Sequence, residues 1–100
     1  MALRPRVIIN ADGLGLNAWN NDRIFEAFDR GWISSTSIMP NMLYFDEAVK
    51  LLKEKGLTQR VGVHVTLDAG VPLTDALREF FPDGPMMLPR RFLLGDIRMV

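Results

Sequence analysis

The order of strand-like and helix-like segments is the feature that most constrains the fold of this chain. Strand candidates span residues 6–11, 32–39 and 61–67, and an amphipathic helical pattern lies between each pair of neighbours. Segments that alternate in this way favour a parallel sheet whose strands are joined by right-handed crossovers. We therefore predict an α/β fold with the order β-α-β-α-β, followed by a loop-rich region with one short helix over residues 74–81.

Both long helices have recognisable ends. An amide oxygen of Asn20 or Asn21 is expected to accept from the free N–H groups at the start of the first helix. Gly31 and Gly56 are expected to end the two helices, because glycine tolerates the left-handed conformation that follows a helix. The tryptophans, Trp19 among them, are expected to pack in the interior.

Polar residues follow the first and third strand candidates. Residues 6–11 are almost wholly apolar, as in strands covered on both faces, and lead to Asp12. In the third strand, His64 and Thr66 alternate with valines. Functional groups gather at the carboxyl ends of parallel strands, so we expect Asp12 and His64 at one edge of the sheet, on the face away from the helices.

The residues alone leave the chemistry open. Asp12 suits a general base or a metal ligand, but an aspartate before a Gly-rich loop also caps an Asx turn. His64, the single histidine, is either a ligand or a structural strand residue. Together they make an incomplete divalent-metal site, because catalytic zinc usually takes three protein ligands. Gly13 and Gly15 lack the dinucleotide-binding spacing and are interpreted as a tight turn.

The serines of the second strand candidate do not favour a hydrolase triad. Ser34, Ser35 and Ser37 lack the G-x-S-x-G context of a nucleophile elbow. A triad would also require His64 as its base.

The amino-acid composition limits the classes of molecule that this chain is expected to bind. Twelve basic residues balance twelve acidic ones, which argues against a nucleic-acid partner. No apolar run approaches the roughly 20 residues that span a bilayer, and the first residues lack signal-peptide features, so we expect no membrane partner and a cytoplasmic location. The chain has no cysteine and hence no disulfide or thiolate zinc site.

Several motifs in the same order resemble the YdjC-like carbohydrate deacetylases, which include chitooligosaccharide deacetylases. The similarity runs from about Arg6 to Leu73 and rests on N-A-D-G-L-G, Asn21 with Ile24 and Ala27, S-S-T-S-I-M, V-G-V-H-V-T-L and G-V-P-L. It implies a (β/α) barrel-like fold, a divalent metal (usually magnesium, with zinc as the alternative) and removal of N-acetyl groups from amino sugars. By this resemblance, Asp12 corresponds to the general base and His64 to a metal ligand.

The chain departs from the family pattern in two ways. Gly13 stands where the family has a second, metal-binding aspartate, so we expect weakened metal binding. Residues 1–100 are interpreted as a single N-terminal portion of the deacetylase domain, since a complete barrel needs about 250 residues. We therefore expect little or no deacetylation by this chain alone, and self-association through open sheet edges. The alternative is a catalytically inactive remnant that binds a partner or a sugar.

Overall fold

The computed structural model describes residues 4–67 and 69–80. The chain divides into two compact units, the first ending at His64 and the second beginning at Val65. The described elements of the first unit are β1 (Asn10–Leu14), α1 (Ala18–Asp29), β2 (Ser35–Ile38), α2 (Phe45–Glu54), a 3₁₀ turn (Thr58–Arg60) and β3 (Val61–Val63).

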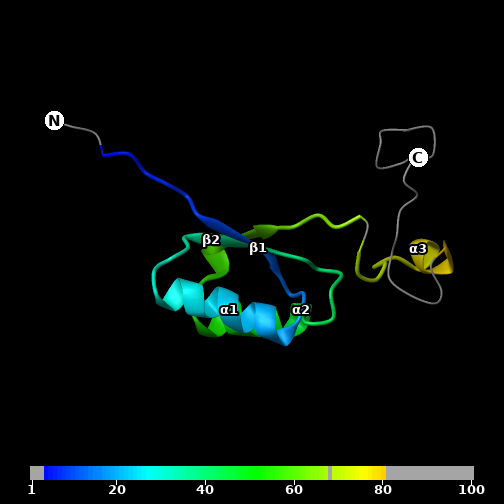
Figure 1. Ribbon diagram of the computed structural model, residues 1–100. Helices are drawn as coiled ribbons and strands as arrows, with labels where there is room; N and C mark the ends of the chain where they lie inside the picture. Colours follow the sequence, from blue (N-terminus) through cyan, green and yellow to red (C-terminus); the bar gives the residue numbers. More distant parts are fainter. Residues whose placement is uncertain (1–3, 68, 81–100) are drawn as a thin grey trace. The chain divides into compact units, whose positions relative to one another are not determined.

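The described strands form one parallel sheet. Their order is β1-β2-β3, and β2 pairs in parallel with both neighbours. Figure 1 shows α1 and α2 on the same side of this sheet. The predicted β-α-β-α-β order and the α/β class are therefore confirmed. A sheet of three described strands is consistent with the start of a larger α/β fold, and the barrel stays a prediction.

The first strand covers Asn10–Leu14 and not residues 6–11, so it begins four residues later and ends three residues later than predicted. The backbone N–H groups of Ser34 and Ser35 both donate to the Ile9 carbonyl, at 2.9 and 3.3 Å, and pairing with β2 begins there. Among the described residues no strand lies beside the apolar segment 7–9. The prediction of a doubly covered strand is therefore wrong, and these side chains are exposed.

The other two strands are shorter than predicted. β2 covers Ser35–Ile38, not residues 32–39, and β3 ends at Val63 instead of Leu67. Pairing stops because β2 itself ends at Ile38, whose carbonyl accepts the His64 N–H at 2.8 Å as a last link. The regular alternation expected up to Leu67 therefore does not apply, and Val63 is exposed.

The helices are short, and their ends follow mostly from local sequence. Asn17, and not Asn20 or Asn21, caps α1 by accepting from the Asn20 N–H at 2.7 Å. Gly31 and Gly56, with φ of 72° and 68°, follow the two helices as predicted. Among the helices that the structure describes, none is long and apolar enough to cross a membrane.

The second unit contains the described helix α3 (Asp75–Phe80), which begins directly after Thr74, the predicted cap. Position 81 of the predicted helix lies outside the described residues. The Thr74 hydroxyl accepts from the Leu77 N–H at 3.3 Å, which is the bond expected of the residue before a helix. The Arg78 side chain donates from Nε to the Pro72 carbonyl at 3.0 Å and so ties this helix to the segment before it.

The core of the first unit lies between the sheet and its two helices. Its buried side chains come from β1, α1, β2 and α2: Leu14, Ile24, Phe25, Ile38, Ala48 and Leu52. Trp19 is 70% exposed, so the prediction that it packs inside is wrong. It precedes the buried Asn21 by two positions, which places it nearly opposite on the helix. Trp32 is also exposed, with the Arg30 guanidinium 5.0 Å from its ring centre.

Asn21 is a polar residue inside this core. Its side chain is fully buried; Oδ1 accepts from the Gly15 N–H at 2.7 Å, and Nδ2 donates to the Tyr44 carbonyl at 3.3 Å. Gly15 and Tyr44 are themselves joined by a backbone bond of 3.1 Å. Asn21 therefore ties together the two loops that follow β1 and β2.

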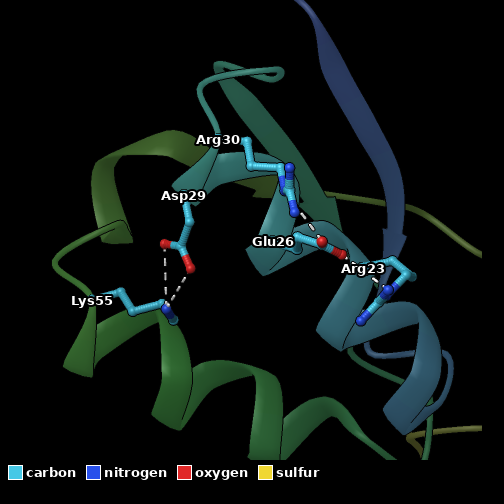
Figure 2. Close-up of polar contacts among 5 residues, drawn as sticks. All are labelled: Arg23, Glu26, Asp29, Arg30 and Lys55. Atoms are coloured by element: carbon cyan, nitrogen blue, oxygen red, sulfur yellow. Dashed lines mark hydrogen bonds and ion pairs between the residues drawn. The ribbon is translucent and has the colours of Figure 1, made fainter.

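Several ion pairs lie on the exposed side of the helices. Figure 2 shows Glu26 on α1 between Arg23 of the same helix, at 3.0 Å, and Arg30, which directly follows the helix, at 3.2 Å. It also shows Lys55 beside Asp29 at 3.3 Å. The Lys55 contact links the end of α1 to the end of α2. Such exposed pairs contribute only about 0–1 kcal/mol each.

We predict that Asn21→Ala lowers the free energy of unfolding by about 2–4 kcal/mol, because the buried Gly15 N–H loses its acceptor and a cavity remains. Urea-induced unfolding measures this change. Asp22→Ala, at the neighbouring exposed position, is the control and should change stability by less than about 0.5 kcal/mol. Equal effects of the two substitutions would contradict a structural role for the buried amide.

Candidate functional site

Polar side chains line the sheet face opposite the helices. Asn10 and Asp12 come from β1, Ser35 and Ser37 from β2, and His64 directly follows β3. On β2 these serines alternate with the buried Thr36 and Ile38, as expected for a strand with one face on the core. We call these five polar residues the polar row.

The polar row is a connected set of hydrogen bonds. Asp12 Oδ1 accepts from Asn10 Nδ2 at 2.8 Å and from the Ser37 hydroxyl at 3.2 Å. Ser37 Oγ lies 3.4 Å from His64 Nδ1. At the other end, the Ser35 hydroxyl donates to Asn10 Oδ1 at 2.8 Å. The structure thus brings Asp12 and His64 to one edge of the sheet and joins them through a serine.

A β-bulge places Asp12 in this row. Ala11 pairs with Thr36 and Leu14 with Ile38, so that Asp12 and Gly13 together stand opposite Ser37. Gly13 has φ of 88°, a conformation that glycine adopts at little cost and that bulges of this kind use. Within the described part of the chain, the hydrogen bonds to the Asp12 carboxylate come from side chains, so the Asx-turn alternative is not what this part of the structure shows.

Gly13 and Gly15 have roles in the local backbone structure. The Gly13 carbonyl accepts from the Leu16 N–H at 3.3 Å, which closes the tight turn expected from the sequence. At Gly15, with φ of 99°, an added Cβ would lie 3.2 Å from the Met39 carbonyl oxygen. Gly15 therefore allows two backbone segments to approach each other.

Sequence reasoning missed Ser37 and its neighbours as site residues. The signal was present: in S-S-T-S-I, Ser35 and Ser37 occupy alternate positions, as Asn10 and Asp12 do in the first motif. Thr66, expected to share the face of His64, lies in the second unit beyond the end of β3 and is not assigned to the polar row.

The described residues supply only part of a metal site. Within residues 4–67 and 69–80, no group of three or more histidine, cysteine, aspartate or glutamate side chains is placed to hold an ion. Asp12 and His64 offer one carboxylate and one imidazole at the same edge. These donor types suit magnesium or zinc, but zinc sites usually have three protein ligands, and magnesium takes mostly oxygens and waters.

Comparison with known proteins gives the family. Residues 6–95 match the sequence model described as YdjC-like protein. The chain belongs to this family. The match covers most of the chain, including β1, β2, β3 and the polar row between them. The family resemblance inferred from the motifs is thus confirmed, whereas the roles of Asp12 and His64 stay predictions.

The relatives found in the comparison carry the name carbohydrate deacetylase. One from Thermoanaerobacter pseudethanolicus is 44% identical over 68 residues, which are 68% of this chain and 27% of the relative. One from Halalkalibacterium halodurans is 37% identical over 90 residues, covering 89% of this chain and 38% of the relative. The chain thus spans between a quarter and two fifths of their lengths. No solved structure matches it.

We predict that Gly15→Ala destabilises this YdjC-like chain more than Gly31→Ala. Both glycines have positive φ, which costs an alanine roughly 1–2 kcal/mol at either site. A Cβ at Gly31 meets nothing within 4 Å, whereas one at Gly15 must displace the Met39 backbone, at about 1–3 kcal/mol more. Urea unfolding of both variants measures the difference. Equal losses would show that the two backbone segments separate without cost.

Proposed function

We propose that this chain supplies Asp12 and His64 to a metal-dependent hydrolase that removes N-acetyl groups from amino sugars or their oligosaccharides. The observation that carries the proposal is the Asp12–Ser37–His64 connection at the carboxyl edge of the sheet. The names of the relatives support a carbohydrate substrate and hydrolysis of an acetyl group. They favour this function over the inactive remnant that the sequence also allowed.

Asp12 is the general base in this proposal. Asn10 and Ser37 both donate to its Oδ1, which fixes the orientation of the carboxylate. The second oxygen, Oδ2, is then directed to take a proton from the water that attacks the acetyl carbonyl carbon. The C–N bond then breaks and acetate forms. Both protons of the attacking water, one of them carried by Asp12, pass to the leaving nitrogen, so that the amino sugar leaves as an ammonium ion. A positioned base of this kind contributes about 10²–10⁴-fold to the rate.

His64 is the metal ligand in this proposal, with magnesium as the preferred ion and zinc as the alternative. His64 would hold the divalent cation, whose chemistry there would be to polarise the acetyl carbonyl and stabilise negative charge on its oxygen. The imidazole holds its place through the bond between its backbone N–H and the Ile38 carbonyl and through the contact of Nδ1 with Ser37.

We predict that Asp12→Asn lowers acetate release at least about 100-fold, since asparagine cannot accept the proton. The measurement uses a chimera in which residues 6–95 replace the matching segment of the Halalkalibacterium halodurans relative, with N-acetylglucosamine oligomers as substrate. Asp22→Asn, on the exposed side of α1, is the matched control and should retain activity. A folded chimera that is inactive, or an Asp12→Asn chimera that is fully active, would contradict the proposed function.

We predict that Gly13→Asp strengthens magnesium binding, on the order of tenfold or about 1.4 kcal/mol, by adding a carboxylate next to Asp12. Titration calorimetry measures the affinity. Gly13→Asn is the matched control, because asparagine tolerates the positive φ as aspartate does but brings no charge. An added Cβ would lie 3.4 Å from Met39 Cε and 3.7 Å from Asn20 Nδ2. The same affinity in both variants would show that position 13 does not face the ion.

A further inference from the structure

We propose that Asn20 is a positioning residue that holds the β-bulge of β1 and thereby keeps Asp12 in the polar row. Its contacts lie between the end of β1 and the first turn of α1. The importance of Asn20 for hydrolysis rests on the proposed function, because only there is Asp12 the general base.

The carbonyl of Gly13, the second residue of the bulge, is directed toward the start of α1. Asn20 Nδ2 donates to this oxygen at 2.6 Å, and the backbone N–H of Leu16 donates to it at 3.3 Å. The bond from Asn20 is the shorter of the two and is partly buried, which strengthens a hydrogen bond relative to an exposed one. A side chain of the helix thus bonds to the backbone of the bulge.

The place of the Asn20 side chain is fixed by the residues around it. Its backbone N–H donates at 2.7 Å to Oδ1 of Asn17, the cap of α1. The next residue, Asn21, is fully buried and accepts from the Gly15 N–H at 2.7 Å. A carbonyl only accepts hydrogen bonds, so the nitrogen of the Asn20 amide, and not its oxygen, faces Gly13.

Two arrangements of β1 compete at the bulge. In the bulged strand Asp12 belongs to the polar row while Leu14 is fully buried in the core. In a regular strand these two residues would share one face, so the burial of Leu14 would take Asp12 away from Ser37. The bond from Asn20 requires the Gly13 carbonyl to point toward α1, as it does in the bulge. Asn20 therefore favours the arrangement that holds the base in the site.

The substitution Asn20→Asp tests this contact with almost no change of shape. A carboxylate has no hydrogen to donate to the Gly13 carbonyl. An acidic residue in the first turn of a helix is also stabilising, so a loss cannot come from a weaker α1. Asn17→Asp is the matched control, because an aspartate there still accepts from the Asn20 N–H and adds the same charge to the same end of the helix.

The first measurement is backbone amide relaxation dispersion by NMR on the chain itself, which detects a minor arrangement of the strand. Loss of one hydrogen bond lowers the ratio of bulged to regular strand by about 2–10-fold. We therefore expect more exchange at the amides of residues 12–14 in Asn20→Asp than in the wild type or in Asn17→Asp. Asn20→Ala, which removes the donor without adding a charge, takes its place if Asn20→Asp fails to fold.

The second measurement uses the active chimera described above. We expect Asn20→Asp to lower kcat by about 2–10-fold with KM unchanged, since substrate binds to both arrangements and only the bulged strand presents Asp12 as the base. Asn17→Asp should leave both constants unchanged. A role of Asn20 in stability alone would not separate kcat from KM.

The outcomes separate this inference from the proposed function. Equal exchange at residues 12–14 in the Asn20 variant and in Asn17→Asp overturns the role of Asn20. So does an active chimera whose kcat is the same for the two variants, and the deacetylase function then stands. Increased exchange combined with an inactive folded chimera leaves Asn20 as the residue that holds the bulge and overturns the deacetylase function.

Discussion

The β-bulge at Asp12 and Gly13 is the constraint on which the polar row depends. In a regular strand Asn10, Asp12 and Leu14 would share one face, because side chains alternate strictly. The structure instead has Asp12 exposed and Leu14 fully buried in the core. The extra residue opposite Ser37 shifts the alternation by one position, so that Leu14 enters the core while Asp12 stays with the polar side chains.

The loops that follow the bulge are held by buried polar contacts, whereas surface ion pairs join the helices. The Asn21 side chain bonds to the backbone of the loop after β1, at Gly15, and to that of the loop after β2, at Tyr44. Leaving the buried Gly15 N–H unpaired would cost about 1–3 kcal/mol. The exposed pair of Lys55 with Asp29 contributes about 0–1 kcal/mol. The buried contacts near the sheet edge that carries Asp12 therefore stabilise the unit more than the surface ion pairs that join the helices.

The sequence predicts the order of elements better than their limits. Alternating patterns reveal the α/β fold, and Gly31 and Gly56 end the helices, because these signals are local. The limits of a strand depend on its partner, which is why Val63 ends β3 where β2 ends. Asn17, Asn20 and Asn21 all suit a helix cap, and their roles differ through distant contacts: Asn21 reaches Tyr44, 23 positions away.

The same limit explains which site residues the sequence reveals. Asp12 and His64 stand out because each is a single ionisable group at the end of an apolar run. Ser37 does not, since a serine in a strand carries no chemical signal until its neighbours on both sides are known. Its alternation with the buried Thr36 and Ile38 indicates the correct face but not the partners.

The position of Ser37 on the middle strand explains why one small residue can contact both Asp12 and His64. Asp12 belongs to β1 and His64 follows β3, and two strand spacings separate these outer strands by roughly 10 Å. Ser37 lies on the strand between them and contacts both: its hydroxyl donates to Asp12 Oδ1 at 3.2 Å, and its Oγ lies 3.4 Å from His64 Nδ1. The middle strand is therefore the place from which one short side chain can contact residues of both outer strands.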